Sequence, residues 1–184
     1  GTDYATISDI TITAGNTTGT TSFTPSDDSI YEGNETGIVA ISSVSGGSAT
    51  ESGSQSVTIT ISENESTPTV TLATSASSIA ENAGSALTLT ATLSLATTAT
   101  VTVSISTSGT GTEGTDYATI SDITISAGDT TGTASFTPTD DASDPVYEEN
   151  ETAIVAISGV SGGGATESGS QSVTLTITEN ESAP

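Results

Sequence analysis

The sequence contains no lysine, arginine or histidine, while aspartate and glutamate together number 23, so the formal net charge is −23. Such a chain cannot neutralise phosphates, which excludes ordinary nucleic-acid binding and argues against attachment to anionic membrane surfaces. High negative charge favours solubility, but it destabilises a compact state through self-repulsion. The folded chain is therefore expected to depend on bound cations or on high salt.

Cysteine is also absent, which excludes disulfides and thiolate chemistry. We expect no enzyme activity, because no His, Cys or Lys is available as a base, a nucleophile or a Schiff-base former. Paired carboxylates serve in glycoside hydrolysis, but here they are clustered, duplicated and without an aromatic platform for a sugar. Membrane insertion is not expected, because no apolar run approaches the length of a membrane span. A Thr/Ser/Gly-rich chain without lysine favours an extracellular or cell-surface location.

The chain contains an internal repeat, in which residues 1–68 and 114–184 are nearly identical. The second copy carries three extra residues in an acidic loop, and residues 69–113 have no counterpart. The pattern predicts a tandem array in which 69–184 is one complete module. Residues 1–68 are then the C-terminal part of the preceding module, with its last four strands.

Apolar residues alternate with threonine in several stretches, as in LTLTATL at 87–93. This period of two predicts strands with one face on a core and the other in water. It argues against a disordered acidic linker, which the aromatic content of 3% would otherwise allow. In the complete module we expect strands near 69–74, 86–94, 99–107, 120–126, 131–137, 152–158 and 171–178.

Seven strands at this spacing predict an all-β fold, a seven-stranded antiparallel two-sheet sandwich of the immunoglobulin-like kind, in tandem repeats. Its core is expected to consist of Val, Ile and Leu, with Phe136, Tyr117 and Tyr147 as the largest side chains. By the same alignment, residues 1–68 lack the first three strands of a module. Either the preceding part of the same polypeptide or a neighbouring chain is expected to supply them, so adjacent repeats or copies of the chain are the expected partners in a linear array.

Carboxylates are concentrated at residues 139–152, with a shorter earlier version at 26–36. Crowded carboxylates without side-chain cations repel one another, and a hard divalent cation with oxygen ligands relieves the repulsion. Such a set suits Ca²⁺ better than the rigid octahedron of Mg²⁺ or the nitrogen and sulfur ligands of Zn²⁺. The alternative is that these loops are simply solvated and hold no metal.

Three segments, in order, resemble a known family: SIAENAG at 78–84, GTDY at 114–117, and the acidic stretch at 140–152. Together they resemble Calx-β domains, which occur in sodium–calcium exchangers and in many long bacterial surface proteins. The resemblance covers all of 69–184 and, from the fourth strand onward, 1–68. It implies that calcium ions sit among these loops at one end of the sandwich.

The resemblance also implies a ligand set in each copy. In the complete module the candidates are Glu81, Asp116, Asp140, Asp141, Glu148 and Glu151, with the backbone carbonyl of Val146. The run after the last strand adds Glu179 and Glu181, where calcium-binding members tend to have consecutive aspartates. In the first copy the candidates are Asp3, Asp27, Asp28, Glu32, Glu35, Glu63 and Glu65, with the carbonyl of Ile30.

The leading hypothesis is a structural tandem repeat of a bacterial extracellular filament or surface adhesin, rigidified by calcium bound at acidic loops between modules. The alternative is a carbohydrate- or host-ligand-binding module within a surface protein, with a cell-surface or matrix ligand, which exposed aromatic residues would favour. Several Asn-x-Ser/Thr matches leave N-glycosylation open, although such matches also arise by chance in a Thr/Ser-rich chain.

Overall fold

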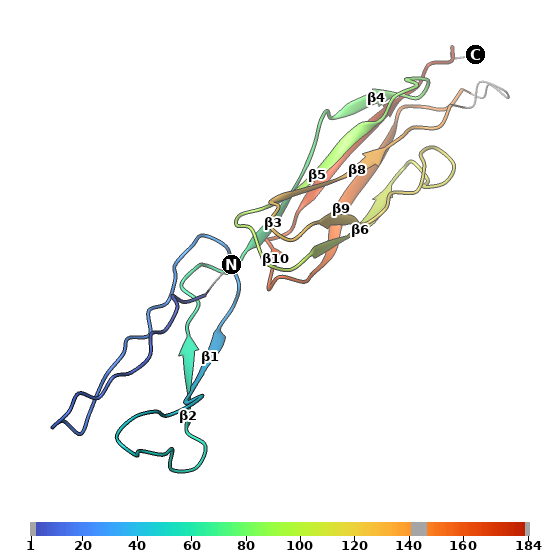
Figure 1. Cartoon of the computed structure of the whole chain (residues 1–184). Coiled ribbons are helices and arrows are strands. Elements are labelled where there is room, and N and C mark those ends of the chain that lie inside the picture. Colours follow the sequence, from blue (N-terminus) through green and yellow to red (C-terminus); the bar gives the residue numbers. More distant parts are fainter. Residues whose placement is uncertain (1–2, 141–146, 183–184) are drawn as a thin grey trace. The chain divides into compact units, whose positions relative to one another are not determined.

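A computed structural model of the chain describes residues 3–140 and 147–182. It divides into two compact units (Figure 1). Unit 1 comprises Gly1–Ser29 and Gly33–Asn64, and unit 2 comprises Ile30–Glu32 and Glu65–Pro184. Every element in the described ranges is a β-strand. The same ranges contain no helix with the length and apolar character needed to cross a membrane.

Unit 2 consists of two sheets. The four-stranded sheet has the order β10-β3-β5-β8, and the five-stranded sheet has the order β4-β11-β9-β6-β7. The first sheet contains β3 (Thr69–Thr74), β5 (Leu87–Leu93), β8 (Thr131–Phe136) and β10 (Thr166–Glu167). The second contains β4 (Ser78–Ala80), β6 (Val101–Gly109), β7 (Ile123–Ile125), β9 (Glu151–Ser161) and β11 (Ser172–Thr178).

Each of the seven strands expected in unit 2 is present, and the prediction of an all-β sandwich is confirmed. The structure adds β4 and β10, which the sequence analysis missed. Both pair in parallel, β4 with β11 and β10 with β3. They are three and two residues long, too short for an alternating pattern to reveal them.

The core lies between the two sheets and follows the alternation of the strands. In β5, Leu89 and Leu93 point inward and are at most 3% exposed. Complete burial of one such side chain contributes about 2 kcal/mol through removal of apolar surface from water. The rings of Tyr117 and Phe136 lie 4.9 Å apart between their centroids and are likewise buried. The placement of Tyr147 in the core was wrong: it is 41% exposed, because it precedes β9 in a loop and no sheet directs it inward.

Unit 1 contains one antiparallel pair, β1 (Glu35–Ala40) with β2 (Ser56–Ile61). The rings of Tyr4 and Phe23 lie 4.7 Å apart between centroids, close to the 4.9 Å of their counterparts in unit 2. The stretches 7–13 and 18–24 form no strand in the described part of the chain. Their counterparts include β7 and β8, which form ladders with β6 and β5. Because 69–113 occurs once in the sequence, unit 1 has no such partners.

Candidate metal centre

The acidic residues of unit 2 gather where several strands begin or end. Parallel pairing sets the last residues of β4 and β11 opposite each other, so Glu81 and Glu179, the next residues, leave the sheet side by side. Antiparallel pairing sets Glu151, the first residue of β9, opposite Ile177 near the end of β11. The ladder register therefore places these three carboxylates at one end of the sandwich.

Asp116 reaches the same end from a tight turn between β6 and β7. Its backbone N–H donates to the carbonyl of Thr112 at 2.9 Å, and its carboxylate accepts the N–H of Thr112 at 2.6 Å. The N–H of Thr139 donates to the carbonyl of Asp116 at 3.0 Å. These hydrogen bonds fix the turn and hold the start of the acidic loop beside it.

Three carboxylates converge from these elements. One oxygen each from Asp116, Glu148 and Glu151 lies within 4.8 Å of the others. Asp116 and Glu151 are partly buried, and Glu148 is exposed. The hollow that they face is lined by Glu81, Thr115, Asp116, Thr139, Glu148, Glu151 and Ile177. Together these residues form the acidic hollow of unit 2.

The electrostatics of the acidic hollow show how crowded it is. Burial is the largest cause that raises the pKa of Glu151, and the charges of Asp116, Glu148 and Glu81 add to it. A hydrogen bond with Asp116 acts in the same direction, and the pKa of Glu151 reaches about 7. Without a cation, the hollow thus holds a proton near neutral pH, because a proton is then the only positive charge available to it.

A second group brings one oxygen each from Glu81, Glu179 and Glu181 within 4.8 Å of one another. Glu179 also organises the backbone: it accepts N–H groups from Glu148 at 2.5 Å and from Asn180 and Glu181 at 2.8 Å. The hydrogen bonds from Glu181 are the largest cause that lowers the pKa of Glu179, and those from Glu148 and Asn180 add to the effect. Glu179 thus ties the segment before β9 to the end of β11.

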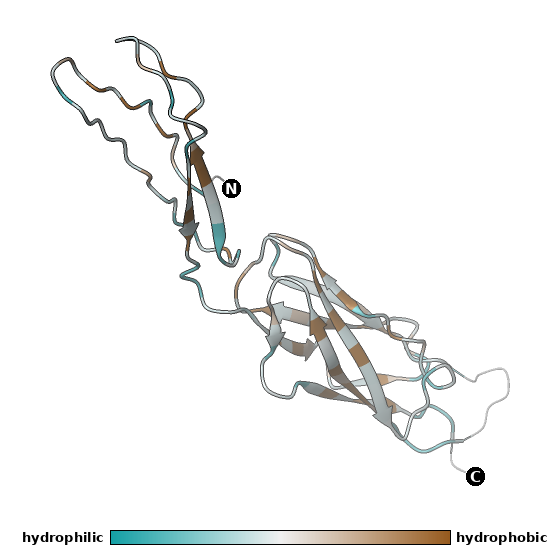
Figure 2. Cartoon of the chain, turned by 90° about the horizontal axis from the view of Figure 1, so that it is seen from below, coloured by the Kyte–Doolittle hydropathy of each residue, from teal (hydrophilic) through white to brown (hydrophobic). Residues whose placement is uncertain are grey.

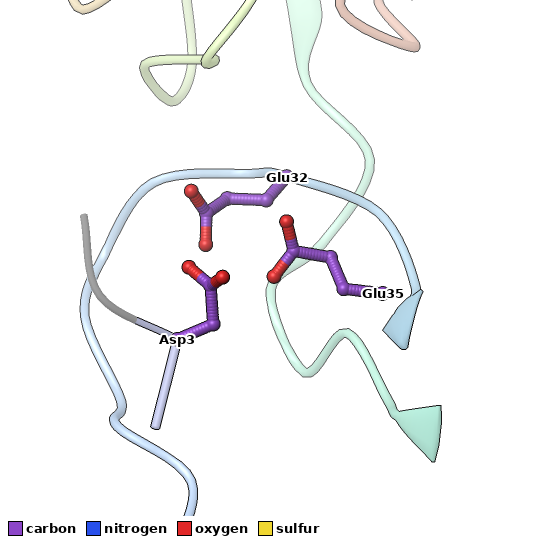
Figure 3. Close-up of side chains that lie close together, drawn as sticks. All are labelled: Asp3, Glu32 and Glu35. Carbon is purple, nitrogen blue, oxygen red and sulfur yellow. The ribbon is translucent and has the colours of Figure 1, made fainter. Parts of the chain in front are cut away.

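The first copy reproduces the three-carboxylate arrangement. Asp3, Glu32 and Glu35 are the counterparts of Asp116, Glu148 and Glu151, and their oxygens also lie within 4.8 Å of one another. Figure 3 shows the three side chains turned toward a common point. The sequence repeat is therefore also a repeat of the carboxylate cluster.

Most hydrogen bonds beside this cluster are repeated as well, although the donor Gly33 corresponds to Glu149 and not to Glu148. Glu63, the counterpart of Glu179, accepts the N–H of Gly33 at 2.7 Å and that of Asn64 at 2.9 Å. Its own N–H donates to the side chain of Asn34 at 2.9 Å, as that of Glu179 does to Asn150 at 3.0 Å. In both copies this glutamate supports the loop that carries the cluster.

The remaining predicted ligands have other positions. Asp140 is exposed and belongs to neither cluster of unit 2 among the described residues. Asp27 accepts the side-chain amide of Asn64 at 2.9 Å. Asp28, Ile30 and Glu65 are not part of the described three-carboxylate cluster of the first copy. Asp141 and Val146 lie outside the described residues.

Sequence reasoning missed Thr115 and Thr139, whose side chains line the acidic hollow. Threonine is so frequent in this chain that neither residue stands out. Their positions in the sequence could have indicated them, because each threonine directly precedes an aspartate that was predicted to be a ligand.

The donors fit a hard divalent cation. Carboxylate and hydroxyl oxygens are the polar side-chain atoms of the hollow, and they come from separate loops. Ca²⁺ takes six to eight oxygen ligands in flexible geometry, whereas Zn²⁺ prefers nitrogen and sulfur. No cationic side chain exists in the sequence to compete for the carboxylates.

Comparison with known proteins identifies a family and a fold. The family model described as the Calx-beta domain matches residues 1–65 and 63–181. Among solved structures, the chain is similar to the crystal structure of an apo-form Calx CBD1 domain, at 17% identity and a TM-score of 0.50. That match covers 61% of this chain and 99% of the other, and at this identity it shows the fold. A search of curated proteins gave no match.

Proposed function

Because the chain belongs to the Calx-β domain family, we propose that its sandwich is a calcium-stiffened structural module, repeated in tandem in a bacterial extracellular filament or surface adhesin. The observation that carries the proposal is the convergence of Asp116, Glu148 and Glu151 in a chain without any cationic side chain. The resident ion would supply the positive charge that these carboxylates lack. Glu81, with the threonines of the hollow, completes the set that would hold it.

The position of these residues explains why an ion would stiffen the module. Asp116 lies in the turn after β6, Glu148 in the segment before β9, and Glu81 after β4. These segments are far apart in sequence. A shared ion ties them together and removes conformational freedom at the end of the sandwich.

Two other activities receive less support. Calx-β is a binding and regulatory domain family, so catalysis is not part of the proposal. A carbohydrate-binding module would be favoured by a platform of exposed rings. All six aromatic residues are among those described, and Tyr147 alone is exposed. The structural module is therefore the function that the geometry supports best.

Calorimetric titration of the full chain with calcium tests the proposal. We expect heat of binding and a rise in the melting temperature, because an ion that binds only the folded state stabilises it by about 2.7 kcal/mol at a hundred times Kd. The variant Glu151→Gln should weaken binding to unit 2 by about tenfold or more, because ligand charge sets calcium affinity. Binding by the first copy should persist until Glu35→Gln is added.

Asp129→Asn is the matched control. It also removes one negative charge, but Asp129 is exposed in the turn between β7 and β8, and the first copy has Asn16 at the same position. This variant should bind calcium as the parent does. A melting temperature unchanged by calcium and by chelator would show that the loops are merely solvated.

A further inference from the structure

Unit 1 presents hydrophobic side chains to solvent. The apolar face of unit 1 consists of exposed large aliphatic residues of the described chain: Ile10, Ile12, Ile41, Val44 and Val57. Their exposed fractions run from 41% to 58%. Figure 2 shows brown, hydrophobic stretches on the two strands of this unit. Large exposed apolar surface of this kind marks a site of interaction.

The same residues are covered in the complete module. At the corresponding positions of unit 2, Ile123 and Ile125 are 0% exposed and Ile157 is 8% exposed. Val160 and Val173 are partly buried against the same core. The side chains are identical in the two copies, so the difference comes from what packs on them. In unit 2 this is the set of strands at 69–109.

The backbone of unit 1 also lacks a strand partner that the complete module has. β9 forms a ladder with β11 through Ala156, and the ladder of its remaining residues, 157–161, is with β6. Their counterparts, 41–45, form no strand, and β1 stops at Ala40. β1 is therefore shortened where its partner would be the counterpart of β6. Unpaired strand edges of this kind accept an added strand.

Two local contacts of the complete module are already present in unit 1. A Cβ at Gly19 would lie 2.5 Å from the carbonyl oxygen of Thr11, and one at Gly132 would lie 2.3 Å from that of Thr124. The chain thus crosses itself equally closely at the same place in both copies. The aromatic pairs beside these crossings also match, at 4.7 and 4.9 Å between ring centroids. The apolar face is pre-organised for its missing partner.

We infer that the apolar face of unit 1 is the acceptor for a donor segment that has the strand pattern of residues 69–109 and lies outside residues 1–184. The donor forms the ladders that β5 and β6 form in unit 2, and its inward residues cover the face. A second copy of the chain is not the donor. Each copy has one such segment and two acceptors, 1–68 and 114–184, so donation would open its own unit 2. This interface is independent of the proposed calcium binding.

The test adds the donor to the full chain. Residues 69–113 are fused directly before Gly1, which recreates the natural junction between Glu113 and Gly114. Amide hydrogen exchange is then measured at 38–45 and 57–61. We expect it to slow by about 100-fold or more, to the rates at 154–161 and 173–177, because a completed ladder opens only with the folded unit.

The matched control carries Leu89→Asp in the added segment only, since Leu89 is fully buried in unit 2. It should leave exchange at 38–45 as fast as in the parent, and protection of 154–161 reports that unit 2 has folded. An intact fusion that gives no slowing would overturn the inference. So would a monomeric parent that already protects both copies equally, or a parent dimer that protects 38–45, since unit 1 would then close by itself or against a second copy.

Discussion

The carboxylates of the acidic hollow are each near others of the same sign. Asp116, Glu148 and Glu151 lie within 4.8 Å of one another, and burial raises the pKa of Glu151 to about 7 with the help of these charges. A proton and a cation therefore compete for the same oxygens. Because of this competition, the stability of the fold should depend on pH and on calcium together.

Stability without calcium should fall as pH rises. The pKa of Glu151 is raised by folding from 4.5 to about 7, so its contribution is complete below pH 4.5 and is lost as pH rises through about 7. The loss is expected to be about 1 kcal/mol after allowance for solvent screening. Melting temperatures in chelator between pH 5 and 8 measure it, and Glu151→Gln should flatten the profile.

Saturating calcium should reverse this dependence, because the ion binds the deprotonated carboxylates and releases a proton. The control Asp129→Asn should retain the profile of the parent in both conditions. A profile in chelator that is the same for the parent and for Glu151→Gln would contradict the assignment of the titrating group.

At the scale of elements, the passage of the chain from β7 in one sheet to β8 in the other depends on one close approach. A Cβ at Gly132 would meet the carbonyl oxygen of Thr124 at 2.3 Å and the side chain of Ile123 at 2.9 Å. The φ of Gly132 is not positive, so glycine is required here for space rather than for conformation. The approach allows β8 to pair with β5 while Ile123 stays in the core.

Gly132→Ala should destabilise unit 2 by about 1–3 kcal/mol, because the added methyl group meets backbone that cannot rotate away. Gly159→Ala is the control. Gly159 lies in β9 with nothing within 4 Å of its Cβ position, and the first copy has Ser43 there. Its effect should stay within about 0.5 kcal/mol. Urea denaturation followed by circular dichroism compares the two, and equal midpoints would contradict the steric argument.

At the scale of the whole molecule, two features stand out: the net charge and the segment that connects β2 to β3. The net charge of −23 has no internal counterion, so ionic strength and bound calcium both reduce self-repulsion. Residues 62–68 alone lie between β2 and β3, and Pro68, which is buried, restricts the backbone at the end of this connection. Glu63 and Glu65 belong to the candidate ligands of the first copy, at the start of the connection.

Small-angle scattering of the chain should therefore respond to calcium. We predict that calcium bound in the first copy, beside Glu63, also restricts the connection, so the chain should scatter as a more extended and rigid particle with calcium than in chelator. Sodium chloride at matched ionic strength controls for simple charge screening. Identical profiles in calcium and in chelator would contradict stiffening, even if the calorimetric titration showed binding.

The sequence by itself determined the repeat and seven of the strands of unit 2, but of the four strands expected in 1–68 the described structure contains β1 and β2. Alternation of apolar residues with threonine, as in β5, is a local pattern, and each of the seven strands it predicted in unit 2 is present. The recurrence of Asp3, Glu32 and Glu35 as Asp116, Glu148 and Glu151 can be read without a structure. So can the absence of cationic side chains, which points to an external cation.

Only the tertiary structure decided which acidic residues meet. The register of β4, β9 and β11 brings Glu81, Glu151 and Glu179 to one end, and this register depends on β4, which is too short to be predicted. Tyr147 is exposed although it was predicted to lie in the core, and Thr115 lines the hollow although it was not predicted as a site residue. Both positions depend on the paths of loops, which no periodic sequence pattern encodes. Burial of identical residues in one copy and their exposure in the other likewise follow from long-range strand partners, since a side chain is covered only by what packs on it.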